Sequence, residues 1–161
     1  MADERLEARR TIAAPPEAVF AILRDPQGHV TIDSSGMLMS ATGSPVSAVG
    51  DEFVVHMDRE ALGDRPIGEY QVTVHITRYE QDREIAWTIE GGLLDPPLGH
   101  VYGYRLEPTG DGGTDIVSYY DWSEINERYR GRIEFPVINP ESLRATLGIL
   151  TRTVANPSST S

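Results

Sequence analysis

The sequence predicts an α+β fold, a curved and mostly antiparallel sheet of about seven strands wrapped round one long C-terminal helix. Three observations predict it. Segments with alternating apolar and polar residues dominate the middle of the 161-residue chain. Short loops join these segments, which favours antiparallel neighbours. An apolar stripe with helical spacing closes the chain, and strands grouped apart from helices are typical of the α+β class.

The N-terminal part predicts one strand and two short helices. Residues 5–13 alternate as a first strand. The Pro-Pro-Glu motif at 15–17 begins a helix, because proline is tolerated in a first turn and an acid is favourable at the positive end of the helix dipole. Asp-Pro at 25–26 ends that helix. A second, shorter helix is predicted over 27–32.

The remaining strands follow in one run. They are predicted over residues 37–41, 52–59, 69–79, 83–90, 100–107 and 114–123. Residues 69–79 show the pattern best, since apolar side chains from Tyr70 to Ile76 share one face and polar side chains share the other. This period of two is typical of a sheet that is wet on one side. The glycine-rich segment 109–113 predicts a hairpin loop.

The final helix is predicted from about Pro140 to Val154. Its apolar stripe consists of Leu143, Leu147, Leu150 and Val154. One helix cannot cover the whole inner face of a sheet, so bulky side chains fill the remaining space or a cavity is left. Gly148 lies in the helix interior, where glycine costs about 1 kcal/mol relative to alanine. The missing side chain makes room for a ligand or for a sheet residue, or it is simply tolerated.

Composition limits the classes of function. We expect one domain over 1–161, with a core of about 5–155 and a polar tail at 156–161. The chain has no cysteine, which excludes disulfides, thiolate nucleophiles and cysteine-ligated metals. Its net charge of -11 argues against nucleic acid and anionic membranes as partners. No apolar run approaches the length of a membrane span, and the N-terminus lacks the apolar stretch of a signal peptide. We therefore expect no membrane insertion and a cytoplasmic location.

Several local strings identify a family resemblance. They are HVTIDSSGM at 29–37, VGDEFVVHM at 49–57, REIAW at 83–87, YRLEPTGDGGT at 104–114, YDWS at 120–123 and FPVINPESLRATLGIL at 135–150. In this order they resemble the START-like (SRPBCC) superfamily, and within it a bacterial subgroup labelled polyketide cyclase/dehydrase-like. The resemblance covers about residues 5–155 and implies a helix-grip fold. Such folds bind lipids, hormones, polyketides or aromatic products, and some members catalyse reactions in the cavity.

Aromatic residues on the predicted inner face are the candidate ligand contacts. They are Tyr70, Trp87, Tyr102, Tyr104, Tyr120 and Trp122, with Leu147 added from the closing helix. Tyrosine and tryptophan combine a flat apolar body with a polar group, so around a cavity they suit a ring-containing ligand with one or two oxygens. The alternative is that they only fill the core. A register error of one residue would reverse the assignment.

His100 is the candidate catalytic residue. It follows the loop 91–99, which is rich in glycine and proline and forms either a lid with glycine hinges or a packed surface loop. Below a lid, His100 would lie where a general base is useful, because aldol-type cyclisation and dehydration both remove a proton next to a carbonyl. The alternative is a structural histidine.

The other histidines carry weaker hypotheses. His29 and Asp33 are four residues apart, so the carboxylate orients the imidazole or, with Ser35, caps the turn. His56 and His75 fall on the predicted outer face. The four histidines lie on separate elements without metal-ligand spacing, and no nucleotide-binding motif or nucleophile elbow is present. We therefore expect no metal and no cofactor.

Three functions remain open at this point. The first is binding of a small hydrophobic or aromatic molecule, lipid-like or polyketide-like, in an internal cavity. The second is a cyclase/dehydratase-type enzyme using a cavity histidine or tyrosine for proton transfer. The third is a protein-interaction module resembling Hsp90 activators. The edge strands 5–13 and 37–41 allow a monomer or a homodimer.

Overall fold

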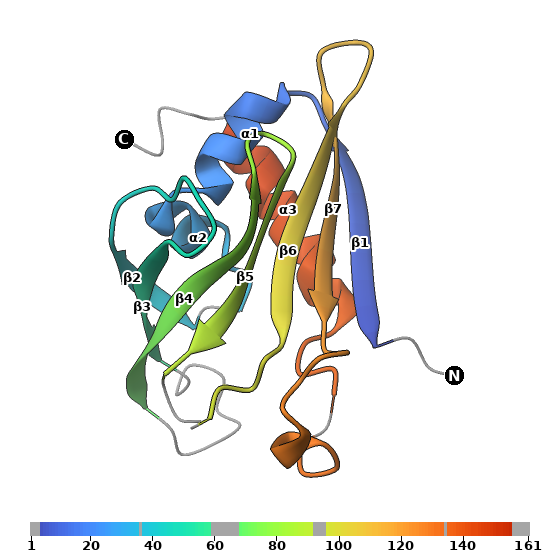
Figure 1. The fold of residues 1–161 in the computed structure, drawn as a ribbon. Coiled ribbons are helices and arrows are strands. Elements are labelled where there is room, and N and C mark those ends of the chain that lie inside the picture. The colour runs from blue at the N-terminus through green and yellow to red at the C-terminus, as the bar shows by residue number, and fades with distance from the viewer. Residues whose placement is uncertain (1–3, 36, 59–67, 92–95, 134, 156–161) are drawn as a thin grey trace.

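A curved antiparallel sheet packs its inner face against three helices in the computed structural model (Figure 1). The structure describes residues 4–35, 37–58, 68–91, 96–133 and 135–155. The strands are β1 (Arg5–Ile12), β2 (Leu38–Thr42), β3 (Glu52–Asp58), β4 (Glu69–Glu80), β5 (Glu84–Glu90), β6 (Val101–Pro108) and β7 (Thr114–Asp121). The helices are α1 (Pro16–Leu23), α2 (Pro26–Ile32), the 3-10 turn η2 (Glu127–Tyr129) and α3 (Pro140–Ala155).

The sheet topology confirms the predicted class and the helix-grip arrangement. The strand order is β1-β7-β6-β5-β4-β3-β2, and every neighbouring pair is antiparallel. β1 and β2 are the two outer strands of this sheet. The helices α1, α2 and α3 all lie on one side of it (Figure 1). The predicted tail 156–161 lies outside the described residues.

Helix starts follow the expected local chemistry. Asp25 is the N-cap of α2, and its carboxylate accepts a hydrogen bond from the Gln27 N–H at 3.0 Å. Asn139 does the same for α3, accepting from the Ser142 N–H at 2.8 Å. α1 begins with a proline at its first position, as the Pro-Pro-Glu motif predicts.

The long strand β4 contains an irregularity that the sequence pattern did not predict. Ile76 pairs with Trp87 on β5, but Arg78 pairs with Ala86, so Thr77 is an extra residue in a β-bulge. The bulge changes which residues point inward. Ile76 is buried before it, and after it Tyr79 turns towards the core and packs edge-on against Phe20 of α1 at 5.5 Å.

The core divides into two clusters. The larger one joins the inner face of the sheet to α1, α2 and α3, and it includes Leu143, Leu147 and Leu150 of the predicted stripe. The smaller one lies at one end of the molecule. It consists of Leu98, Tyr120, Trp122, Ile125 and Tyr129. Within the described part of the chain, no helix combines the length and apolar character needed to cross a bilayer.

Candidate functional site

An open cavity of about 1350 Å³ lies between the inner face of the sheet and the start of α3. Its walls come from β3, β4, β5 and β6, from α2 with the turn that follows it, and from the segment preceding α3. The apolar part of the wall includes Val55, Met57, Val72, Val74, Ile89 and Leu143. The cavity exists because the first turn of α3 reaches only part of the sheet, as expected for a single closing helix.

Five of the eight residues predicted for the site line this cavity. They are Tyr70, Trp87, His100, Tyr102 and Tyr104. The strand register explains the grouping, since Trp87 and Tyr102 are direct cross-strand partners, and the residue two positions before Trp87 pairs with Tyr104. Side chains on one face of neighbouring strands necessarily meet.

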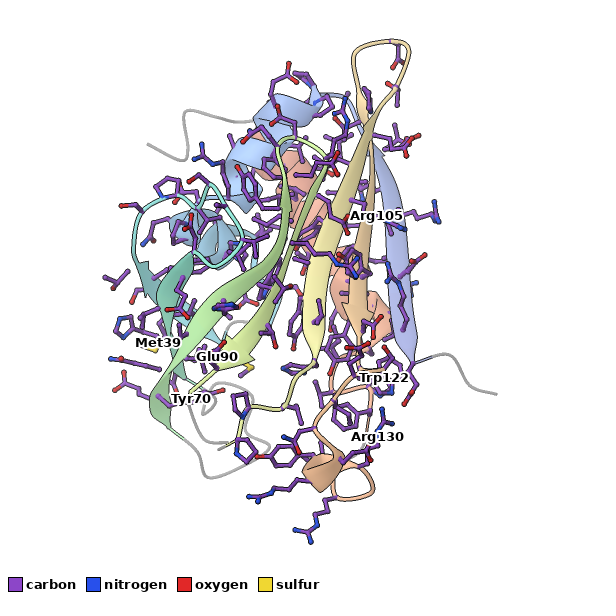
Figure 2. The ribbon with its side chains drawn as sticks, viewed as in Figure 1. Met39, Tyr70, Glu90, Arg105, Trp122 and Arg130 are labelled. Atoms are coloured by element: carbon purple, nitrogen blue, oxygen red, sulfur yellow. The ribbon has the colours of Figure 1, made fainter. Side chains whose placement is uncertain are left out.

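The other three predicted residues lie outside the lining. Tyr120 and Trp122 are buried in the smaller core cluster, and Figure 2 shows Trp122 at the far end of β7, near the segment that carries Arg130. Leu147 is buried against the sheet deeper in the main core. The face predicted for all three is inward, but the cavity does not extend to them.

The aromatic side chains form a connected array. The rings of Trp87 and Tyr102 stack with centroids 5.9 Å apart and planes 13° apart. The ring of Tyr104, from the same strand as Tyr102, lies tilted against the same indole with centroids 5.8 Å apart. His29 of α2 meets the same indole edge-on at 4.7 Å. This flat wall offers a surface for another ring.

His100 is held in place beside this array. Its Nδ1 lies 2.8 Å from the Tyr120 hydroxyl, and its backbone carbonyl accepts a hydrogen bond from the Thr88 hydroxyl at 2.7 Å. Burial lowers the pKa of His100 to about 4, so the ring is neutral at pH 7. Burial also raises the pKa of Tyr120, and a hydrogen bond from the backbone of Val137 offsets part of that rise. With Nδ1 engaged, Nε2 is the nitrogen left to meet a ligand.

His29 is a second neutral imidazole at the cavity. Its Nε2 lies 2.8 Å from the Leu23 carbonyl oxygen, which can only accept, so Nε2 carries the proton. Burial lowers the pKa of His29 to about 4, although the Leu23 carbonyl acts in the opposite direction. Asp33 does not orient this ring. Its carboxylate instead accepts from the Ser35 N–H and hydroxyl and from the Leu38 N–H, which is the turn-capping alternative.

The loop before His100 is anchored at its described end. The Pro96 carbonyl accepts from the Tyr129 hydroxyl at 2.6 Å, and the Leu98 carbonyl accepts from the Asn126 N–H at 2.9 Å. This half of the loop fits the packed alternative better than a mobile lid. Residues 92–95 of the predicted lid lie outside the described residues.

Sequence reasoning missed part of the wall. The segment before α3 contributes Arg132, Ile133, Phe135, Val137, Ile138 and Asn139. It has no regular period, so no pattern indicated where its side chains point. Gly148, by contrast, does not reach the cavity. A Cβ added there would meet Arg10 Nη1 of β1 at 3.7 Å, so the space left by this glycine faces a sheet residue.

A family model described as "Polyketide cyclase / dehydrase and lipid transport" matches residues 3–145. The chain belongs to this family. It is a START-like (SRPBCC) protein, as the sequence strings indicated. An uncharacterized protein of Mycobacterium tuberculosis, Rv0088, is 26% identical over 112 residues, which are 69% of this chain and 44% of that protein. The chain thus matches less than half the length of that relative.

Several solved structures of other proteins share the fold. Protein NE0264 from Nitrosomonas europaea aligns with a TM-score of 0.64 at 16% identity, covering 99% of both chains. Protein CV1439 from Chromobacterium violaceum aligns with a TM-score of 0.62 at 16% identity, and the alignment covers 94% of this chain and 96% of that one. The Aha1 dimer from Colwellia psychrerythraea aligns with a TM-score of 0.60 at 15% identity, and the alignment covers 96% of each chain. At these identities the likeness concerns the fold alone.

Proposed function

We propose that the protein binds a small, largely apolar, ring-containing molecule in the cavity between the sheet and α3. The observation that carries the proposal is the stacked pair of Trp87 and Tyr102 next to His100 in an open cavity. The stacked rings supply a flat apolar surface, and the imidazole supplies one fixed polar contact. Sites for small molecules combine these two elements. The family description, which includes lipid transport, supports the same reading.

The hydrogen bonds around His100 favour a ligand with an acceptor oxygen. Burial raises the pKa of Tyr120, so its hydroxyl keeps its proton at pH 7 and can donate it to His100 Nδ1 at 2.8 Å. In that arrangement the neutral imidazole carries its own proton on Nε2 and presents an N–H donor. A carbonyl or ether oxygen on the ligand is the natural partner of such a donor.

The same arrangement makes an enzyme of the cyclase/dehydratase type the weaker candidate. A general base works best when its pKa lies near the operating pH. The pKa of His100 is about 4, and protonation of Nε2 in the favoured tautomer removes the lone pair that a base requires. The Hsp90-activator alternative has only fold-level likeness behind it, which does not extend to function.

A pair of probes that differ by one oxygen tests the proposal. In a Trp122→Phe variant, Trp87 is the only tryptophan and reports on the cavity. We expect 1-tetralone, a bicyclic aromatic ketone, to quench this fluorescence saturably. Adding His100→Phe should lower the affinity for 1-tetralone by about fivefold to tenfold, which corresponds to the loss of one hydrogen bond. The affinity for the hydrocarbon tetralin should not change.

Two results would count against it. If neither probe gives saturable quenching while circular dichroism shows the native fold, the cavity is not a binding site for such molecules. If His100→Phe weakens both probes equally, the ring acts by packing and not by hydrogen bonding.

A further inference from the structure

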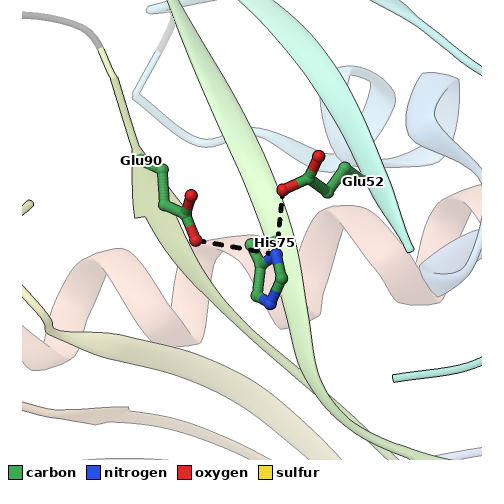
Figure 3. Close-up of side chains that lie close together, drawn as sticks. All are labelled: Glu52, His75 and Glu90. Atoms are coloured by element: carbon green, nitrogen blue, oxygen red, sulfur yellow. Dashed lines mark hydrogen bonds and ion pairs between the residues drawn. The ribbon is translucent and has the colours of Figure 1, made fainter. Parts of the chain in front are cut away.

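Three side chains with metal-ligating atoms meet on the outer face of the sheet, opposite the cavity. Glu52 of β3, His75 of β4 and Glu90 of β5 converge there (Figure 3). His75 Nδ1 lies 2.9 Å from Glu52 Oε2 and 3.6 Å from Glu90 Oε1. One ligating atom from each of the three side chains lies within 4.8 Å of the others.

The strand register holds this cluster together. His75 is the direct cross-strand partner of Glu52, and Glu90 pairs with Thr73, two positions along β4. His75 points outward because its neighbours Val74 and Ile76 are buried in the core. Direct and diagonal neighbours on one face of a sheet lie within reach of each other. The sequence search for ligand spacing along the chain could not detect this arrangement, because the three residues come from three strands.

The charges of the cluster are out of balance. Two carboxylates share one imidazole, which leaves an excess of negative charge whether or not the ring is protonated. Among the described residues, no arginine forms an ion pair with Glu52 or Glu90, whereas Glu84 on the same strand as Glu90 pairs with Arg78. A divalent cation would supply the missing positive charge.

The distances also suit a small coordination shell. Zinc binds imidazole nitrogen and carboxylate oxygen at about 2.0–2.2 Å, so two ligands of a tetrahedral site lie about 3.3 Å apart. The observed separations of 2.9 and 3.6 Å lie on either side of that value. The three side chains are between 32% and 48% exposed, so an ion and a completing water molecule can reach them.

We propose that Glu52, His75 and Glu90 bind a divalent transition-metal ion of the zinc class on the outer face of the sheet. One imidazole nitrogen with two carboxylates suits Zn²⁺ or Co²⁺, while Mg²⁺ and Ca²⁺ prefer six or more oxygen ligands. In the metal-free structure His75 Nδ1 donates a hydrogen bond to the Glu52 carboxylate, so the incoming ion would replace the proton on Nδ1 and leave the ring with its proton on Nε2. The bound ion would join β3, β4 and β5, whose opposite faces form a wall of the cavity.

Metal titration of the full chain tests this site independently of the cavity. After treatment with EDTA and its removal, we expect calorimetry with ZnCl₂ to show one site per chain, and CoCl₂ to give the visible absorption of a tetrahedral complex. His75→Gln and Glu90→Gln should each weaken Zn²⁺ binding at least tenfold. His56→Gln is the matched control. His56 lies on the same face of β3, bonds to Thr42 and takes no part in the cluster.

The outcomes separate a built site from general attraction to an acidic surface. Equal Zn²⁺ affinity in His56→Gln and His75→Gln, or weak binding with several ions per chain, would overturn the proposal. Loss of binding when Mg²⁺ is present in large excess would overturn the zinc class. Circular dichroism of each metal-free variant shows whether the fold is retained, and Glu90→Gln decides the question if His75→Gln does not fold.

Discussion

At the scale of single residues, Gly103 and Gly148 differ in the space around them: Gly103 is covered by a side chain, whereas Gly148 has room for a Cβ. Gly103 lies on β6 directly opposite Tyr119 of β7, and the tyrosine ring covers it. The Tyr119 hydroxyl donates to Glu84 at 2.7 Å, and the Arg5 guanidinium lies 4.1 Å above the ring. Gly103 is therefore the position that allows this outer-face arrangement, since any side chain there would displace the ring.

We expect Gly103→Ala to destabilise the protein by about 1–3 kcal/mol, the usual cost of overpacking. The new Cβ would overlap the Tyr119 ring and force it away from Glu84. Urea denaturation at pH 7 measures the change.

Gly148→Ala should have the opposite effect. Its Cβ meets only Arg10 Nη1, at an ordinary contact distance of 3.7 Å, and helix α3 gains up to about 1 kcal/mol of propensity. The same urea experiment compares the two variants. Equal effects of both substitutions would contradict the structure at these positions.

At the scale of elements, α3 combines a buried part with a part that borders the cavity. Leu150 is fully buried in the core, whereas Leu143 in the first turns lines the cavity. The sequence predicted this helix closely, because its apolar stripe and the proline at its start both agree with the structure. It also predicted Leu147 as a ligand contact, but the cavity ends before that turn.

We expect Leu150→Ala to cost about 2–5 kcal/mol in the free energy of unfolding, because it removes a fully buried side chain. Probe affinity should not change. Leu143→Ala should cost less, since its side chain already borders open space, and it should change the affinity for 1-tetralone. Thermal melts and the Trp87 titration distinguish the two variants. A change in probe affinity in Leu150→Ala alone would show that the cavity lies elsewhere.

The strands show where sequence reasoning stops. Alternation in β4, β5 and β6 correctly placed Trp87, Tyr102 and Tyr104 on one face, since period two is a local property. The bulges at Thr77 and Met39 are not visible in that alternation, because they depend on how two strands pair. The irregular segment before α3 contributes cavity wall through tertiary packing alone.

At the scale of the whole molecule, two buried neutral histidines link folding to pH. His29 and His100 have pKa values of about 4 in the folded protein against 6.5 in an unfolded chain. Below pH 6.5 the unfolded chain binds protons that the folded protein does not. The free energy of unfolding therefore falls as the pH decreases from 6.5 to about 4, and the histidines add no further loss below that.

We expect each histidine to lower stability by an amount of order 3 kcal/mol at pH 4 relative to pH 7. Urea denaturation across this range, repeated for His29→Phe and His100→Phe, measures it. The carboxylates contribute equally to the wild type and the variants, so the difference between their slopes isolates the histidine. Identical slopes in wild type and variant would show that the residue titrates alike in the folded and unfolded chain.

The bulge in β4 divides this strand into two parts whose side chains contact different regions of the molecule. Before Thr77, the inward side chains of Tyr70, Val72 and Val74 line the cavity, and His75 points to the opposite face of the sheet. After Thr77 the alternation shifts by one residue, so that Tyr79 points inward and packs against Phe20 of α1. One continuous strand thus has two parts with different packing partners, the cavity for the first part and α1 for the second, separated by a single unpaired residue. Substitutions in the first part can alter ligand binding, while the second part still packs against α1.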